Sequence, residues 1–575
     1  MNESISTMSL IKDTLDEWLD NVSPKDGETL RSLDSAELKD AFFRDLAFGT
    51  GGLRGKLGLG PNRMNTYTVG KATQGLADYL NAHFEKPTVA LCRDTRHGSE
   101  EFVRKAAGVL AANGIRSHLY ERVEPTPALS FAVRELGCSA GVNITASHNP
   151  AAYNGYKVYG PDGCQITVGA AEEIQAAIDA VDVFEGVRDM PFDEALAQGM
   201  VEWVGEGVLD RYIEETLRSS TGEDCSKLRI AYTPLHGVGL ECVGRALEAV
   251  HVAEVVRVEE QCVADGGFPT CPYPNPEIRE ALELGLSYCD RVRPDLLLAT
   301  DPDADRVGIA VPHGGEYRLL SGNEVGLLLL DFLAEKAEGE GIGLARKVAC
   351  TTVVSAPMAD DVARARGFEL RRTLTGFKFI GEQVGLLEAE GRAGDFLMGF
   401  EESYGYLAGT CVRDKDAVVA SMLICELAAH WKAEGKDLYE AMEVLYGRCG
   451  FWGSALLSQA YEGPEGAAEM AAMMAGLRAG APAELGGIAV ASAIDYSAGA
   501  DMPVVNPGPG SARKLPPADV FELRLADGSR AIFRPSGTEP KAKAYVFAKG
   551  SGREEADSKL AALSAAAKHI LEGSR

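Results

Sequence analysis

Three aspartates at alternate positions are the residues in this sequence best suited to chemistry. Asp301, Asp303 and Asp305 follow an apolar run at 295–300 that predicts a buried strand. Carboxylates this close repel one another unless a cation neutralises them, and all-oxygen ligands suit Mg²⁺. The spacing does not fit a calcium-binding EF-hand, because the sixth position is Arg306 and the twelfth is Pro312. The triplet therefore predicts a magnesium site.

The same aspartates allow a second interpretation. The segment 303–307 fits the D-x-D-x-[TV] pattern of aspartyl-phosphate phosphatases, in which Asp303 would be the nucleophile. This hypothesis stays open at this point.

A serine lies in the loop at 145–150, directly after a small, apolar run at 140–144 that predicts another buried strand. Ser147 has His148 beside it, and a turn signal at 154–157 ends in Lys157. No glycines frame the serine, which argues against the nucleophile elbow of esterases. A phosphorylated serine, with three acceptor oxygens, would suit a cation held by three aspartates. Loops at strand ends are where α/β proteins place their chemistry.

Other polar loops have the composition of phosphate- or sugar-binding sites. The glycine-rich stretch 48–55 carries Arg54, and we expect a loop that approaches an anion. The segment 534–538 offers a guanidinium group, two hydroxyls and backbone N–H groups, as a phosphate cradle does. The acidic loop 401–403 could bond sugar hydroxyls. Lys378 and Lys415 are candidate phosphate ligands or acid/base groups, although lone lysines are more often surface cations.

The elements that must position these loops alternate as strand and helix. A polar break near 219–224 and another near Gly322 separate three such stretches, which predict three small α/β units. The tail differs: Asp527-Gly528 between two alternating runs predicts a hairpin in a smaller α+β domain. We predict domains at 1–218, 219–321, 322–448 and 449–575.

Composition limits the function further. The 575 residues carry 57 Lys+Arg against 85 Asp+Glu, a net charge of -28, which disfavours nucleic acid as a partner. The first residues lack the pattern of a signal peptide, and no apolar run is long enough to span a membrane. The 12 cysteines are scattered without disulfide or zinc spacing, so we expect reduced thiols in a cytoplasmic protein.

Four motifs together resemble the α-D-phosphohexomutase superfamily, the phosphoglucomutase and phosphomannomutase enzymes. They start at Thr145, Asp301, Gly399 and Arg534, one in each expected domain, and glycine-rich 49–55 is similar to the longer phosphoglucomutase and phosphopentomutase branch. The resemblance implies three similar mixed α/β domains plus a C-terminal TBP-like α+β domain around a central active-site cleft. It also implies a phosphorylated Ser147 that binds Mg²⁺ with Asp301, Asp303 and Asp305. Implied catalytic residues are Ser147, His148, Arg54, Lys157 and Lys378; implied substrate-binding residues are Arg306, Thr375, Gly376, Glu401, Ser403, Lys415, Arg534, Ser536, Gly537 and Thr538.

The expected activity is the interconversion of glucose 1-phosphate and glucose 6-phosphate, with glucose 1,6-bisphosphate as intermediate and activator, in a monomer or small homo-oligomer. Alternatives are a phosphopentomutase, a phosphomannomutase, the phosphatase above, or an inactive sugar-phosphate binder. Some relatives carry a histidine just after the Glu-x-Ser motif, where this chain has Tyr404 and Gly405. The acid/base group is therefore open among Lys157, Lys378, Lys415 and His148.

Overall fold

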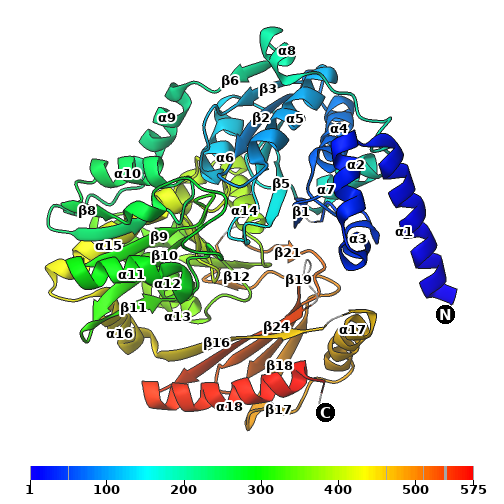
Figure 1. Ribbon diagram of the computed structural model, residues 1–575. Helices are drawn as coiled ribbons and strands as arrows, with labels where there is room; N and C mark the ends of the chain where they lie inside the picture. The colour runs from blue at the N-terminus through cyan, green and yellow to red at the C-terminus, as the bar shows by residue number, and fades with distance from the viewer. Residues whose placement is uncertain (1, 50, 462, 509, 537–540, 574–575) are drawn as a thin grey trace. The chain divides into compact units, whose positions relative to one another are not determined.

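Figure 1 shows the computed structural model of the chain with its helices and strands. The chain divides into two compact units. It describes residues 2–49, 51–461, 463–508, 510–536 and 541–573. The first unit comprises residues up to 220, 225–310 and 409–422, and the second comprises 221–224, 311–408 and the chain from 423 onward.

Three helices precede the first sheet. They are α1 (Asn2–Asn21), α2 (Pro24–Ser32) and α3 (Ser35–Phe42). Asp34 caps α3 in a reciprocal capping box with Glu37, which fixes where the helix begins. Their apolar faces meet around Trp18, whose ring contacts Phe42 and Tyr67 edge-on.

The first sheet has the strand order β1-β5-β4-β2-β3-β6. Its strands are β1 (Gly52–Lys56), β2 (Thr88–Arg93), β3 (Arg116–Leu119), β4 (Ala140–Ile144), β5 (Tyr153–Tyr159) and β6 (Val201–Trp203). Its helices are α4 (Thr66–His83), α5 (Ser99–Ala112), α6 (Thr126–Glu135), α7 (Val168–Asp179), α8 (Phe192–Ala197) and α9 (Glu206–Leu217). All five residues of β4 are buried, and β2 pairs with both β3 and β4 in parallel. The loops after β2 and β4 therefore leave the same edge of the sheet.

Two sequence-based expectations for this sheet are wrong. The expected turn at 154–157 lies inside strand β5, and the expected glycine-rich loop contains strand β1, on which Arg54 lies. The two strands pair antiparallel, with Gly52 opposite Lys157. A β-carbon on Gly52 would lie 2.2 Å from the Tyr156 carbonyl oxygen, so the glycine allows a close approach of two backbones rather than a flexible loop.

The second sheet contributes β10-β9-β7-β8 to the first unit. Its elements are β7 (Arg229–Thr233), α10 (Leu240–Ala249), β8 (Glu254–Arg257), α11 (Arg279–Val292), β9 (Leu296–Thr300) and β10 (Val307–His313). β9 is entirely buried and pairs antiparallel with β10, with Thr300 opposite Val307. The loop 301–306 is therefore held tightly between two paired strands.

In the second unit, a third sheet has the order β15-β14-β12-β13-β20. This stretch of the chain begins with β11 (Glu316–Leu320), which is an edge strand of the second sheet. It continues with α12 (Gly322–Gly339), β12 (Val348–Thr352), α13 (Met358–Arg366), β13 (Glu369–Thr373), α14 (Lys378–Ala389), β14 (Phe396–Glu401), β15 (Gly405–Leu407), α15 (Ala417–Ala433) and α16 (Leu438–Cys449). Parallel pairing of β12 with β13 and β14 confirms the third α/β unit.

The C-terminal part of the second unit is rich in antiparallel strands, ordered β16-β24-β23-β22-β18-β17. Its elements are β16 (Phe451–Ala460), α17 (Gly463–Ala479), β17 (Glu484–Leu485), β18 (Ile488–Asp495), β22 (Phe521–Leu525), β23 (Arg530–Pro535), β24 (Lys541–Gly550) and α18 (Arg553–Leu571). The predicted hairpin joins β22 to β23, and α18 packs on β16 and β24 (Figure 1). The α+β tail is thereby confirmed.

One excursion from this C-terminal sheet had no counterpart in the sequence analysis. Between β18 and β22 the chain forms β19 (Ala500–Asp501), β20 (Val504–Val505) and β21 (Lys514–Leu515). β20 pairs with β13 as the edge strand of the third sheet.

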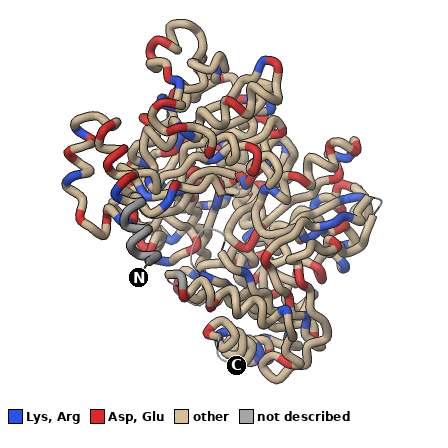
Figure 2. The backbone as a smooth tube through the Cα atoms, turned by 90° about the vertical axis from the view of Figure 1, so that its right-hand side faces the viewer, with Lys and Arg blue, Asp and Glu red and all other residues tan. Residues whose placement is uncertain are grey.

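Charged residues of both signs are interspersed along the backbone, as Figure 2 shows. Among the described residues, no helix is long and apolar enough to cross a membrane.

Candidate active site

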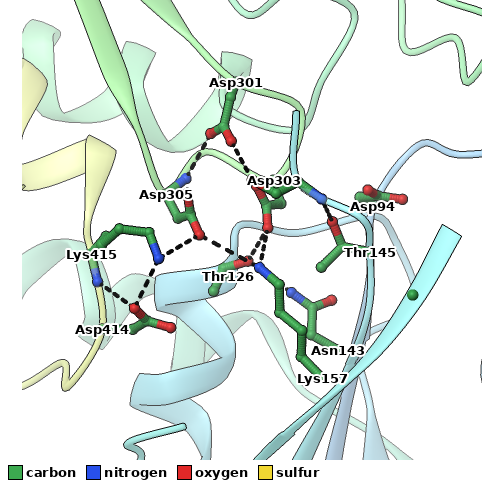
Figure 3. Close-up of polar contacts among 12 residues, drawn as sticks. Asp94, Thr126, Asn143, Thr145, Lys157, Asp301, Asp303, Asp305, Asp414 and Lys415 are labelled. Atoms are coloured by element: carbon green, nitrogen blue, oxygen red, sulfur yellow. Dashed lines mark hydrogen bonds and ion pairs between the residues drawn. The ribbon is translucent and has the colours of Figure 1, made fainter. Parts of the chain in front are cut away.

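The three aspartates form the centre of the candidate site in the first unit. Asp301, Asp303 and Asp305 are buried, and each offers a carboxylate oxygen within 4.8 Å of the others (Figure 3). Asp301 Oδ1 accepts hydrogen bonds from the backbone N–H groups of Asp305 and Arg306, at 3.1 and 3.0 Å, so the loop folds back around its first carboxylate. Asp303 Oδ1 and Asp305 Oδ1 receive no hydrogen bond. Buried carboxylate oxygens without donors are suited to a cation.

The electrostatics of the triad also call for positive charge. Burial and the neighbouring carboxylates of Asp303 and Asp305 raise the pKa of Asp301 well above its usual range. Burial opposes ionisation of Asp303 as well, but the ammonium group of Lys157 outweighs it and lowers the pKa of Asp303. A divalent cation would favour the ionised form of all three groups, so its binding would release protons.

Successive hydrogen bonds from elements of the first sheet orient Asp303. The Thr126 hydroxyl donates to Asp303 Oδ2 at 3.0 Å, and the Thr126 backbone N–H donates to the Asp303 carbonyl at 2.9 Å. The Asn143 amide donates to the Thr126 hydroxyl at 2.8 Å. Thr126 begins α6 and Asn143 lies on β4, so two elements of the first sheet fix one carboxylate of the metal loop. Outer partners of this kind orient ligands.

Ser147 lies against the triad. Its hydroxyl donates to Asp301 Oδ2 at 2.9 Å, and its Oγ lies 3.2 Å from His148 Nδ1. The backbone of Ser147 has a φ of +53°, a left-handed conformation that is uncommon for a residue with a β-carbon. Burial, together with the guanidinium groups of Arg306 and Arg54, holds the pKa of His148 well below its usual range. The serine is thus at hydrogen-bonding distance from a candidate metal ligand.

Two lysines neutralise part of the cluster, as Figure 3 shows. Lys157 Nζ lies 2.9 Å from Asp303 Oδ2 and 3.6 Å from Asp305 Oδ2. Lys415 Nζ lies 3.1 Å from Asp305 Oδ2 and 3.2 Å from Asp414 Oδ1. Burial alone would lower the pKa of Lys157, but the two aspartates outweigh it and raise the pKa. Two of the three lysines predicted from the sequence, Lys157 and Lys415, therefore lie at the triad.

Two arginines complete the cationic surroundings. Arg54 Nη1 lies 3.4 Å from the Asn149 side-chain oxygen, in the loop that carries Ser147. Arg306 directly follows the triad, and its Nη1 lies 2.7 Å from Glu277 Oε1. The first unit thus gathers the predicted metal ligands together with Arg54, His148, Lys157 and Arg306, whereas the predicted catalytic residue Lys378 lies in the second unit.

The remaining predicted residues lie in the second unit. Glu401 is buried at the end of β14, and Ser403 lies in the turn before β15. Arg534 lies on β23. Burial raises the pKa of Tyr545, as does Glu402, while Arg534 opposes the shift. The acidic loop and Arg534 therefore lie close enough to act on one tyrosine.

The other predicted site residues of that unit are the substrate-binding candidates after β13 and β23 and the catalytic candidate Lys378. Thr375 and Gly376 follow β13, and Lys378 begins α14 with its ammonium 5.5 Å from the centre of the Phe379 ring. Ser536 directly follows β23, whereas Gly537 and Thr538 lie outside the described residues.

Sequence reasoning missed the residues that orient the site. Thr126 and Glu277 contact the predicted residues Asp303 and Arg306 from other parts of the chain. Asn143 holds Thr126, and Asp414 pairs with its chain neighbour Lys415. The sequence carried no specific signal for them, because a threonine, an asparagine or a single acidic residue has many structural roles.

Comparison with known proteins agrees with this geometry. The models for phosphoglucomutase/phosphomannomutase α/β/α domains I, II and III match residues 45–183, 210–315 and 321–448. A phosphoglucomutase from Staphylococcus epidermidis is 35% identical over 513 residues, which are 89% of this chain and 92% of that protein. A phosphoglucomutase from Staphylococcus aureus is 36% identical over 529 residues, 92% of this chain and 94% of that protein. The chain belongs to the phosphoglucomutase/phosphomannomutase family.

Members of this family are isomerases that transfer a phosphoryl group, and the chain is an enzyme of this class. A solved structure of a putative phosphomannomutase from Thermus thermophilus has the same fold, with a TM-score of 0.67 at 23% identity, and the match covers 92% of this chain and 99% of that one. The buried aspartate triad within the second family domain fits a metal site.

Proposed function

We propose that this enzyme interconverts glucose 1-phosphate and glucose 6-phosphate through a phosphorylated Ser147 and a glucose 1,6-bisphosphate intermediate. The observation that supports this most is the 2.9 Å hydrogen bond from Ser147 to Asp301, within a buried aspartate triad that has carboxylate oxygens without donors. Such a serine is placed to carry a phosphoryl group beside a cation. The relatives named phosphoglucomutase favour glucose as the sugar.

In the proposed reaction, phosphoserine 147 gives its phosphoryl group to a free hydroxyl of the sugar phosphate. The bond between the serine oxygen and phosphorus breaks as a bond between the sugar oxygen and phosphorus forms. The proton of the sugar hydroxyl leaves to a basic group, and the serine oxygen regains a proton. The bisphosphate then turns, and its other phosphoryl group returns to Ser147 by the same steps in reverse.

The residues of the first unit would have different roles in the reaction. Lys157, held protonated by Asp303 and Asp305, would offset negative charge on the transferring group. Arg54, beside the Ser147 loop, would do so from another side. His148 and Lys157 are the acid/base candidates that lie at the serine and the triad. Lys415 would keep Asp305 in place.

The metal would be Mg²⁺, held by Asp301, Asp303, Asp305 and a phosphate oxygen on Ser147. When bound, Mg²⁺ supplies charge stabilisation for phosphoryl transfer.

The second unit carries residue types that bind the rest of a sugar phosphate. Glu401 and Ser403 would bond sugar hydroxyls, and Thr375 and Gly376 would offer a hydroxyl and a backbone group. Arg534 and Ser536 would bind the phosphate that does not react, as the fork of a guanidinium group does.

A substrate panel tests the proposal. The protein is assayed with Mg²⁺ and a trace of glucose 1,6-bisphosphate against glucose 1-phosphate, mannose 1-phosphate and ribose 1-phosphate. We expect the highest kcat/KM with glucose 1-phosphate. Faster turnover of the pentose phosphate would make the enzyme a phosphopentomutase, and faster turnover of mannose 1-phosphate a phosphomannomutase. Release of inorganic phosphate without isomerisation would support the phosphatase alternative.

A further inference from the structure

One buried arginine holds most of the backbone of the Ser147 loop. Arg96 Nη1 donates to the carbonyl oxygens of Pro150 and Tyr153, at 2.9 and 3.0 Å. Arg96 Nη2 donates to the carbonyl oxygens of Ser147 and Asn149. A single guanidinium group thus binds four carbonyl oxygens between positions 147 and 153. Arg96 is only 3% exposed, so water does not replace these bonds.

We propose that Arg96 is a positioning residue that fixes the Ser147 loop for phosphoryl transfer, and that a segment at 266–268 locks Arg96 in place. The inference rests on the proposed role of Ser147 as the phosphoryl carrier. Arg96 does not touch the reacting atoms; it acts through the backbone that presents them.

The Ser147 loop needs the four hydrogen bonds from Arg96, which we call the clamp, for two reasons. The left-handed φ of +53° at Ser147 is a strained conformation, which persists only where surrounding contacts determine it. The loop also turns four carbonyl groups toward the protein interior, and buried carbonyls require donors. The five N–H donors of an arginine in a planar fork meet both needs, whereas the single ammonium group of a lysine cannot span the same acceptors.

Asp94 holds the guanidinium group from its other side. Arg96 Nε lies 3.2 Å from Asp94 Oδ2, and neither side chain is exposed. Asp94 Oδ1 in turn accepts hydrogen bonds from the Arg96 backbone N–H at 2.9 Å and from the Ser99 hydroxyl at 3.0 Å. The charge of Arg96 is therefore paired, and its orientation is fixed by the first turn of α5.

The segment 266–268, which holds Arg96 in place, belongs to the same sheet unit as the metal loop 301–306. The Phe268 ring centre lies 4.9 Å from the Arg96 guanidinium carbon, a cation–π contact. Gly266 packs on the backbone of the same segment: a β-carbon there would lie 2.5 Å from His97 N and 2.7 Å from Arg96 Cα. Residues 266–268 lie between β8 and α11, two elements of the second sheet. The serine and the triad are therefore fixed to one another by a contact beyond their own hydrogen bond.

The test compares the full-length wild type with Arg96→Met, Arg96→Lys and Phe268→Leu. Arg104→Met is the matched control, because Arg104 is an exposed arginine on α5 that pairs with Glu100. Three readouts are taken: hydrogen exchange of the amides at 145–153, the rate at which glucose 1,6-bisphosphate loads phosphate onto Ser147, and KM and kcat.

We expect Arg96→Met to increase the rate of amide exchange in 145–153 by about tenfold or more, because local opening of the loop no longer has to break the Arg96 hydrogen bonds. Amide exchange in the second sheet should change little. Loading of Ser147 and kcat should fall together by about 100-fold, with KM within about threefold, since positioning acts on the reacting groups. Arg96→Lys should restore only part of the loss, Phe268→Leu should show a smaller loss of the same kind, and Arg104→Met should match wild type.

Unchanged exchange at 145–153 and unchanged loading in a folded Arg96→Met protein would overturn the proposal, as would full rescue by lysine. If Arg96→Met does not yield folded protein, Arg96→Lys and Phe268→Leu decide by the same readouts. A wild type that never acquires phosphate on Ser147 would contradict the proposed function, and hydrogen exchange would still test the clamp by itself.

Discussion

The hydroxyl of Ser147 donates a hydrogen bond to Asp301 at 2.9 Å across a sequence separation of 154 residues. The contact joins the loop after β4 of the first sheet to the loop after β9 of the second. It turns two separate sequence motifs into one site with a serine, three carboxylates and two lysines.

Removing one carboxylate from the triad should remove the metal. Asp303→Asn keeps the size of the side chain but removes its negative charge and leaves one neutral oxygen as a ligand, so kcat should fall by at least about 100-fold. In the wild type, chelation should abolish activity and added Mg²⁺ should restore it. Mg²⁺ should also raise the melting temperature of the wild type, since a ligand that binds only the folded state stabilises it. The same rise in Asp303→Asn would contradict a metal site at the triad.

Thr126→Val should weaken metal binding without removing a ligand. Valine keeps the shape but loses the hydroxyl that donates to Asp303 Oδ2. Loss of an outer partner typically costs about 10–100-fold in metal affinity. The control is Thr216→Val, because Thr216 is equally buried but bonds only the backbone carbonyl of Tyr212. Mg²⁺ titrations of activity and of melting temperature measure both variants, and equal affinities for the two would contradict the orienting role.

Lys157→Met should slow phosphoryl transfer more than it weakens substrate binding. The variant removes the ammonium group that pairs with Asp303 and Asp305. We expect kcat to fall by about 100-fold or more with a smaller change in KM. Lys105→Met is the control, since Lys105 pairs with Asp189 away from the triad. A kcat within a few fold of wild type would exclude Lys157 from the reaction.

Glu124 should make stability depend on pH. Burial raises the pKa of Glu124 to about 7, although Arg122 opposes the shift. Between the ordinary glutamate pKa of 4.5 and this value, the folded state binds a proton that the unfolded state has released. Stability from this group is therefore full below about pH 4.5 and is lost as the pH rises to about 7, by an amount on the order of 3 kcal/mol.

Glu124→Gln should remove that decline, because glutamine stays neutral at every pH. Thermal unfolding from pH 5 to pH 8 should show a smaller loss of melting temperature in the variant than in the wild type. Glu121→Gln on the neighbouring exposed position serves as the control. Parallel pH profiles for wild type and Glu124→Gln would contradict the raised pKa.

The residues that carry charge and chemistry could be predicted from the sequence. Asp301, Asp303 and Asp305 have a spacing with few structural explanations, and the apolar run before them already indicated a buried strand. The hypothesis that Ser147 carries a phosphoryl group arose only from its combination with that triplet. Lys157 and Lys415 were weaker predictions, because a lysine is usually a surface cation, yet both lie within 4 Å of Asp305.

Residues whose role depends on folding could not be predicted. Arg96 is one arginine among many, and only the folded loop shows its four carbonyl partners. The glycine-rich stretch with Gly52 predicted a loop that approaches an anion, whereas Gly52 lets β1 approach β5. The edge strand Val504–Val505 lies far in sequence from β13, and no local pattern indicates such a distant pairing.

The most direct test of the central claim is the chemical nature and position of the phosphoenzyme. The protein is incubated with Mg²⁺ and glucose 1,6-bisphosphate labelled in its phosphates, digested and mapped by mass spectrometry, and then chased with unlabelled glucose 1-phosphate. The account predicts acid-stable phosphate on Ser147 that passes into glucose 6-phosphate at the rate of turnover, and no label in Ser147→Ala. Hydroxylamine-labile phosphate on Asp303, with Ser147 unmodified, would contradict it.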